Sequence, residues 1–197
     1  MTNFFSINSY EPFASIKISD YLFSILNPII LSNTPLIFIC IGSDRSTGDS
    51  LGPLIGYKLK TLYNKYIHIY GSLDNPIHAQ NITDIMSKIN SYYNNPYIVA
   101  IDSCLGKSSN VGKIIIKQQP LVPGAALNKN LNPIGNMSII GVVNIASSFE
   151  FLTLQSTKLS LVMNLADIIS QSILSFSLKT KNSINTYLDN NINKKNV

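Results

Sequence analysis

Short apolar runs alternate with helix-like periodicity along most of this chain. The run at 35–42 is continuously apolar between Pro35 and Gly42, which is typical of a strand buried on both faces of a sheet. Across residues 51–66, apolar side chains recur at steps of three and four, which predicts a helix with one buried stripe. The same patterns predict further strands at 66–73, 96–102, 112–121 and 137–145, and further helices at 12–26, 82–92 and 161–176.

The order of these elements predicts an α/β fold with a mainly parallel sheet, because the helical segments are long enough to cross between parallel strands. In such sheets, ligand sites lie beyond the carboxyl ends of the strands, where Asp44, Asp49 and Asp102 fall. We interpret residues 1–180 as one domain. Further on, the periodicity gives way to Asn, Lys and Ser, so residues 181–197 are predicted to be a polar, disordered tail.

Composition and charge exclude several classes of protein. The net charge is +5, but only 13% of residues are charged and no basic stripe with aromatic residues occurs, so we expect no nucleic-acid partner. Cys40 and Cys104 lie in or beside apolar runs, as buried thiols do in a reducing compartment. Asn and Pro interrupt the apolar stretch 21–41, and residues 1–10 lack the features of a leader. We therefore expect a soluble, cytoplasmic protein with no membrane partner.

The loop IGSDRSTGDSLGP, residues 41–53, has the outline of a phosphate-binding loop but not its chemistry. Five residues separate Gly42 from Gly48, and Asp49 stands where such a loop carries Lys. Carboxylates near a helix N-terminus repel the anion that the backbone amides would attract. The acidic side chains themselves are therefore the candidate chemistry.

Asp49 and Asp102 are the candidate catalytic pair, since each follows a predicted strand of one parallel sheet. When two carboxylates lie close together, one tends to keep a proton while the other loses it. The anionic member can then activate water, and the neutral member can protonate a leaving amine. Alternatively, the two acids and the imidazole of His78 could bind a divalent metal that activates water.

Structural roles for these acids stay open at this stage. Asp49 or Ser50 could cap the following helix. Asp102 could cap a turn or pair with Arg45, and Asp44 beside Arg45 is typical of a solvated pair on a loop.

Two histidines and one thiol complete the set of reactive side chains. His68 alternates with two Ile residues and is interpreted as a structural residue on a strand face. His78 lies in the turn-rich stretch DNPIHAQN, on the carboxyl side of the sheet, and is a candidate for the site. Cys104 has no evident His partner, and no Gly-x-Ser-x-Gly nucleophile motif occurs.

The chain resembles the YyaC-type sporulation proteins of endospore-forming bacteria over residues 36–175. Four segments carry the resemblance: CIGSDRSTGDSLGPLIGYKL, DNPIHAQNI, IDSCLGKSSNVGKI and MSIIGVVNIASSFEFLTLQSTKLSLVMNLADIIS. That family is regarded as a group of spore proteases, similar to the spore germination protease and to hydrogenase maturation endopeptidases. The resemblance implies a three-layer α/β sandwich of the phosphorylase/hydrolase type, with a mainly parallel, mixed sheet.

The resemblance also implies roles for particular residues. Asp49 in GDSLGP and Asp102 in IDSCLG match the two acidic positions of those proteases. The maturation endopeptidases add a late His that binds nickel of the partner protein, but GNMSIIGVVN, residues 135–144, contains none. This departure favours an aspartate pair without a cofactor over a metal site of Asp49, Asp102 and His78.

Together these observations predict an endopeptidase that acts on a small protein or peptide in sporulation or germination, in the forespore or spore core. Gly48 and the amides at the following helix start are expected to stabilise the oxyanion. The candidate binding or positioning residues are Asp44, Arg45, Gly48, Ser50, His78 and Ser103. The alternatives are a non-catalytic peptide-binding sporulation protein and a metal-dependent endopeptidase; assembly into a homo-oligomer is left open.

Overall fold

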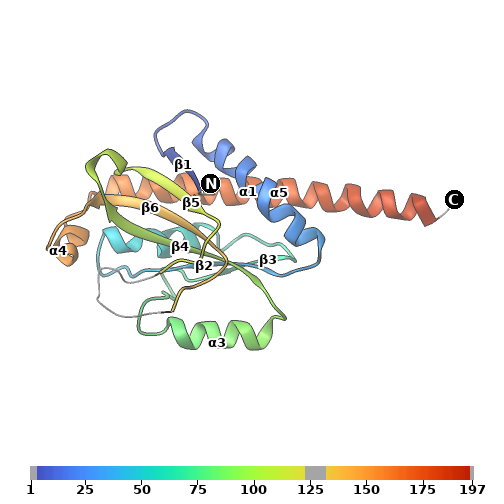
Figure 1. Ribbon diagram of the computed structural model, residues 1–197, viewed down its shortest axis with the longest axis horizontal. Coiled ribbons are helices and arrows are strands. Elements are labelled where there is room, and N and C mark those ends of the chain that lie inside the picture. Colours follow the sequence, from blue (N-terminus) through green and yellow to red (C-terminus); the bar gives the residue numbers. More distant parts are fainter. Residues whose placement is uncertain (1–3, 123–131, 196–197) are drawn as a thin grey trace.

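The computed structural model describes residues 4–122 and 132–195, with side chains described as far as residue 186 (Figure 1). Six strands of the described chain form one sheet in the order β1-β5-β6-β4-β2-β3. In chain order, the strands are β1 (Phe4–Asn8), β2 (Leu36–Cys40), β3 (Ile67–Tyr70), β4 (Tyr97–Gly106), β5 (Lys113–Lys117) and β6 (Met137–Ile145). Strands β6, β4, β2 and β3 run parallel, whereas β5 runs antiparallel to both β6 and β1. The sheet is therefore mixed and mainly parallel, as the sequence predicts.

Helices lie on both faces of this sheet, which confirms the predicted three-layer α/β architecture (Figure 1). One face carries α1 (Ala14–Leu31), α2 (Leu51–Lys58) and α5 (Leu159–Lys195), and the other carries α3 (Ile82–Tyr92). The remaining helical segments are the 3₁₀ turns η1 (Gly48–Ser50) and η2 (Ser108–Asn110) and the short helix α4 (Glu150–Gln155).

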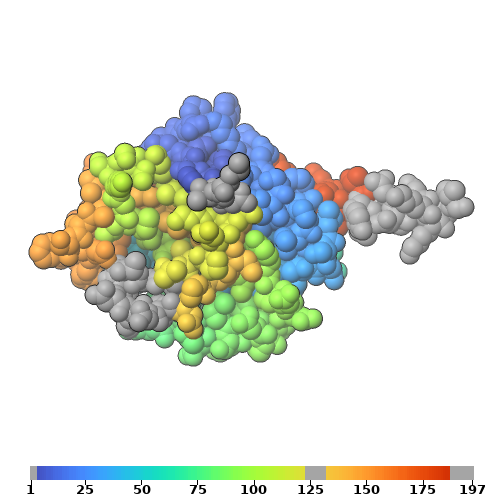
Figure 2. Space-filling model, viewed as in Figure 1, coloured from blue at the N-terminus to red at the C-terminus, as the bar shows by residue number. Residues whose placement is uncertain are grey.

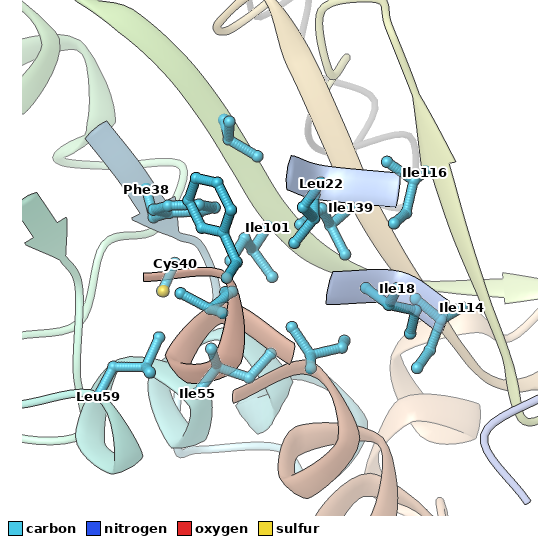
Figure 3. Packing of buried hydrophobic residues seen from close by; sticks show 14 of the residues in the cluster. Ile18, Leu22, Phe38, Cys40, Ile55, Leu59, Ile101, Ile114, Ile116 and Ile139 are labelled. Atoms are coloured by element: carbon cyan, nitrogen blue, oxygen red, sulfur yellow. The ribbon is translucent and has the colours of Figure 1, made fainter. Parts of the chain in front are cut away.

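The alternation of side chains along the central strands explains why β2 is apolar throughout. Phe38 of β2 faces α1, α2 and α5, in the cluster that Figure 3 shows with Ile55 of α2 and Ile101 of β4. Ile37 and Ile39 point to the opposite face and pack with residues of α3. Because both faces are covered, neither set of side chains can be polar without a hydrogen-bond partner.

Helices α1 and α5 are long and apolar enough to cross a membrane by length and composition alone. In this structure they pack against each other and against the sheet. Ile18 and Leu22 of α1 and Leu165 and Ile169 of α5 are fully buried in the core. Their apolar residues therefore serve as one layer of the sandwich.

Several helix boundaries differ from the sequence prediction. The helix predicted across 51–66 ends at Lys58, where a turn at 59–61 leads the chain back to the edge of the sheet. Helix α1 continues beyond residue 26 to Leu31 and contains Pro28. Strand β1 and helix α4 were not predicted, because both are short and partly exposed.

The segment predicted to be a disordered tail continues as helix. Helix α5 extends to Lys195, so most of 181–197 has regular backbone structure. Asn27 of α1 donates a hydrogen bond to Ser183 Oγ at 3.1 Å, and Ile184 packs against the core. These contacts support the helix past residue 180, and polar composition alone does not reveal them.

Helix α4 projects from one end of the molecule, where Figure 2 shows it in orange at the left. The side chains of Phe149 and Phe151 are 72% and 64% exposed there. Its inner side packs against η1, through Leu154 and Thr157, which approach Gly48. Helix α4 therefore adjoins the loop that carries the acidic residues.

Candidate active site

The loop between β2 and α2 is folded back on itself by its own backbone. The N–H of Gly42 donates to Ile77 O at 2.7 Å, and the N–H of Ser43 donates to Asp49 O at 3.1 Å. Gly42 has φ 138°, and a Cβ there would lie 2.0 Å from Asp49 O. Only glycine fits this close approach without displacing the segment that carries Asp49.

Asp49 lies in η1 at the carboxyl end of β2 and is half-buried. Neither Asp49 nor Ser50 makes a side-chain capping bond to α2, so the capping interpretation is wrong for both. Burial raises the pKa of the Asp49 carboxyl, while a backbone hydrogen bond from Ser43 and the nearby His78 oppose that rise. The structure thus leaves this carboxylate available for chemistry.

Asp102 lies on β4 and points to the α3 side of the sheet, as Ala100 does two residues earlier. The backbone N–H of Ser103 donates to Asp102 Oδ1 at 2.7 Å. Burial raises the pKa of Asp102 to about 8, and the charge of Asp49 adds to that rise, while the Ser103 hydrogen bond opposes it. Burial and the neighbouring acid therefore both favour the protonated form of Asp102.

The two acids form an electrostatically coupled pair at one rim of the sheet. Asp49 follows β2 and Asp102 belongs to the adjacent strand β4, and the charge of one acts on the other. Neither belongs to a salt bridge within the described ranges, so the predicted Asp102–Arg45 pair is not formed there. Burial favours the protonated form of both acids, and the pKa of Asp102 is the one that rises to about 8; coupled carboxylates whose pKa values differ can serve acid–base catalysis.

His78 reaches the same rim from the loop between β3 and α3. Its backbone N–H donates to Asn81 Oδ1 at 2.9 Å, and its Nδ1 accepts a hydrogen bond from the Gln80 N–H at 3.3 Å. The second bond favours the tautomer with hydrogen on Nε2. The electrostatic effect of His78 on Asp49 places the imidazole near the acidic pair.

The structure gives less support to a role in the site for the other predicted residues. Asp44 and Arg45 are exposed on the loop. The Ser50 hydroxyl is buried and donates to Thr47 O at 2.7 Å, so its predicted binding role has no support in this arrangement. Ser103 acts on the pair through its backbone, by the hydrogen bond to Asp102.

The predicted oxyanion donors are used within the loop. The N–H of Asp49 donates to Ser46 O at 3.1 Å, and the N–H of Ser50 donates to Thr47 O at 3.3 Å. Gly48 is buried beneath α4, where a Cβ would lie 2.7 Å from Leu154 Cδ2. The amides of Asp49 and Ser50 are therefore occupied within a 3₁₀ turn and do not support the expected oxyanion role in this arrangement.

The side chains do not form a ready metal site. Within residues 4–122 and 132–186, no group of three His, Cys, Asp or Glu side chains is arranged to bind a common ion. The alternative set of Asp49, Asp102 and His78 consequently does not fit a three-ligand centre as arranged here. Cys104, on the same strand as Asp102, has its pKa raised to about 11 by burial and by Asp102, which disfavours a thiolate nucleophile.

Sequence reasoning missed the cleft next to His78, a cavity of about 390 Å³ at the carboxyl end of β3. Tyr70 and Asp74 line it together with His78. The signal was present in the turn residues of GSLDNP, residues 71–76, but nothing in their pattern shows which side chains share a cavity. His68 lies outside this lining, and its ring stacks at a tilt against Tyr93, with centroids 4.7 Å apart, in agreement with a structural role.

Comparison with known proteins identifies relatives of this chain. It is 44% identical over 139 residues to the uncharacterized protein YyaC of Bacillus subtilis (strain 168), which covers 71% of this chain and 68% of that protein. The crystal structure of the [NiFe] hydrogenase maturation protease HycI from Thermococcus kodakarensis KOD1 matches 74% of this chain and 98% of that chain, with 15% identity and a TM-score of 0.38. A family model described as protein of unknown function (DUF1256) matches residues 6–172. The chain therefore belongs to the DUF1256 family.

Proposed function

We propose that this protein is an endopeptidase in which Asp49 and Asp102 act as an aspartate pair. The observation that carries the proposal is the placement of the two acids on neighbouring segments, Asp49 after β2 and Asp102 within the adjacent strand β4, where burial and the charge of Asp49 raise the pKa of Asp102 to about 8. The Asp49 anion is supported by Ser43 and His78. In this proposal Asp102 is the proton donor and Asp49 the proton acceptor, the two roles that peptide hydrolysis without a metal requires.

In the proposed reaction, the Asp49 carboxylate takes a proton from water while the water oxygen bonds to the carbonyl carbon of the scissile peptide. Asp102 gives its proton to the carbonyl oxygen, which yields a neutral diol. Asp49 then transfers its proton to the amide nitrogen, and the C–N bond breaks. The remaining hydroxyl proton returns to Asp102, so both acids recover their starting states.

Protonation by Asp102 replaces the oxyanion site that the loop amides do not supply. Because the amides of Asp49 and Ser50 already donate within the loop, the charge on the carbonyl oxygen needs another partner. The Asp102 hydroxyl is that partner in this scheme, and the Ser103 N–H holds the other oxygen of the same carboxyl group. Ser103 is thus a positioning residue.

The biological setting is also a proposal, and the resemblance to YyaC-type sporulation proteins supports it. We assign the substrate to small proteins or peptides of the spore. The setting is the cytoplasm of the forespore or the spore core, during sporulation or germination. The 44% identity to a Bacillus subtilis protein fits an endospore-forming host.

The test compares the wild type with Asp49→Asn and Asp102→Asn on a mixture of small basic spore proteins, with products identified by mass spectrometry. Each substitution removes a proton acceptor or donor, so we expect cleavage to fall by about a hundredfold or more. Asp84→Asn is the matched control, because Asp84 is an exposed acid on α3, outside the loop and the strand that carry the pair.

Each result has a defined meaning. Full activity in both pair variants would contradict the aspartate-pair mechanism. Binding of the spore proteins without cleavage by the wild type would favour a non-catalytic binding protein. Loss of activity with a chelator, restored by a divalent metal, would favour a metal-dependent endopeptidase instead.

A further inference from the structure

The cleft next to His78 has a volume of about 390 Å³ and is open to solvent. Its volume is at the lower end of the range of about 300–1,000 Å³ typical of small-ligand pockets. That size suits a side chain of a bound polypeptide rather than a folded partner. His78 lines the cleft and also acts electrostatically on Asp49. A polypeptide with one side chain bound in the cleft would therefore also pass near the acidic pair.

The charge of the cleft is opposite to that of the chain as a whole. The protein carries a net charge of +5, yet among the described residues, 4–122 and 132–186, no Lys or Arg lines this cavity. Asp74 is its lining carboxylate, and in the part of the chain that the structure describes Asp74 belongs to no salt bridge. An exposed acid that forms no salt bridge among the described residues is available to a cation from outside.

The cleft also offers an aromatic face and an apolar wall. The ring of Tyr70 lines it and is held edge-on against Tyr93, with centroids 6.5 Å apart and planes at 87°. A hydrogen bond of 3.3 Å between the two hydroxyls fixes the same pair. Pro76, Ile77 and Ile85 supply apolar lining. Long cationic side chains use such surfaces, because the stem packs on carbon while the charge meets an acid or a ring face.

The loop that forms the cleft is rigidly held by hydrogen bonds. Asn81 Nδ2 donates to Pro76 O at 3.0 Å, and the Ser72 N–H donates to Asn75 O at 3.1 Å. Gly71 has φ 88°, and a Cβ there would lie 2.1 Å from Cys40 O, so the loop sits directly on β2. A cleft built on a fixed backbone binds with a smaller loss of entropy than one that must be ordered by its ligand.

We propose that this cleft binds a Lys or Arg side chain of the substrate polypeptide, with Asp74 as the ion-pair partner and Tyr70 as the stacking surface. The inference deepens the proposed endopeptidase function, since it names a substrate feature for the same site. This inference depends on Asp49 and Asp102 only for whether the bound peptide is then cleaved. Binding of the cation itself requires neither Asp49 nor Asp102 to react.

Binding is therefore tested separately from cleavage. The full-length Asp102→Asn protein, labelled with ¹⁵N, is titrated with capped alanine-based peptides that differ in one central residue: Lys, Arg, norleucine or Glu. We expect the Lys and Arg peptides to shift the amide resonances of residues 70–81, with affinities about tenfold above that of the norleucine peptide. Equal binding of the norleucine or Glu peptide would overturn the proposal.

Matched variants locate the interaction. Asp74→Asn is expected to weaken binding of the Lys peptide about tenfold, whereas Asp84→Asn, an exposed acid on α3 outside the cleft, is expected to leave it unchanged. Tyr70→Leu is expected to weaken binding of the Arg peptide, and Tyr70→Phe is expected to retain it because the ring remains. An Asp74→Asn protein with an intact amide spectrum and undiminished binding would contradict the assignment.

The two proposals fail in different ways. If the cation binds in the cleft but no peptide is cleaved, the endopeptidase proposal fails and the cleft assignment stands. If peptides are cleaved with no preference for a nearby Lys or Arg, the cleft assignment fails and the aspartate pair stands.

Discussion

The two faces of the sheet differ in the size of the apolar cluster that each one buries. On the face with α1, α2 and α5, the inward residues form one large apolar cluster that runs from Ile7 to Phe176. On the face with α3 the apolar cluster is smaller, and it gives way to Asp102 toward the carboxyl end of β4. Stability is thus concentrated on one face, and polar chemistry is tolerated on the other because solvent still reaches it.

Strand β4 shows this contrast between two consecutive residues. Ile101 is fully buried against the large cluster, while Asp102 points to the opposite face and is half-buried. The strand period of two places these neighbours in unrelated environments. An apolar residue and a carboxylic acid can therefore be adjacent in sequence without conflict.

The largest expected effect comes from removing a buried side chain on the face that carries α1, α2 and α5. Ile101→Ala leaves a cavity in the large cluster, so we expect the free energy of unfolding to fall by about 2–5 kcal/mol. Asp102→Asn retains the Ser103 hydrogen bond to the side-chain oxygen and removes the cost of burying an acid, so we expect the free energy of unfolding at neutral pH to stay the same or to rise. Urea unfolding at neutral pH measures both, and equal losses would show that the two faces contribute alike.

A second effect, carried by one proton, is expected when pH is varied. The pKa of Asp102 is raised from 3.8 to about 8 by folding, so the folded protein binds more protons than the unfolded chain between these values. The free energy of unfolding should then fall as pH rises from about 4 to about 8, and Asp102 should add no further loss above that. Asp102→Asn should show a shallower decline in urea unfolding at matched pH values. Identical pH profiles would mean that Asp102 is ionised normally in the folded protein.

The smallest effect concerns an ion pair on the packed face. Lys58 of α2 and Asp167 of α5 form a salt bridge at 2.7 Å, and both side chains remain partly exposed. Lys58→Met keeps most of the apolar stem, so we expect a loss of less than about 1 kcal/mol in thermal or urea unfolding. A loss comparable with that of Ile101→Ala would show that charge, rather than burial, joins these two helices.

Much of the fold is predictable from the sequence because each apolar pattern has a local cause. The run Leu36–Cys40 is apolar because both faces of β2 are covered, and α3 matches its predicted bounds because its periodic residues meet the sheet. The extension of α5 is not predictable in the same way. It depends on contacts with α1, such as that between Asn27 and Ser183, which are far apart in the chain.

The acidic pair was predicted from topology, while its surroundings were not. Asp49 follows β2, whereas Asp102 lies within the adjacent strand β4, which continues to Gly106 and so extends past the predicted strand end at residue 102; the parallel pairing of β2 with β4 places both on neighbouring segments. The use of the Asp49 and Ser50 amides within a 3₁₀ turn depends on a local backbone geometry that residue types do not specify. The cleft lined by Tyr70 and Asp74 likewise depends on how the loop folds against β2.

The amino-acid sequence by itself determined the strands, most of the helices, the α/β class and the two acids at the strand ends, because these follow from periodicity and strand order. Only the tertiary structure decided which acid keeps its proton, which amides are occupied and where a cleft opens. Those properties depend on burial, on charges brought together from distant parts of the chain and on backbone geometry, none of which a single segment contains.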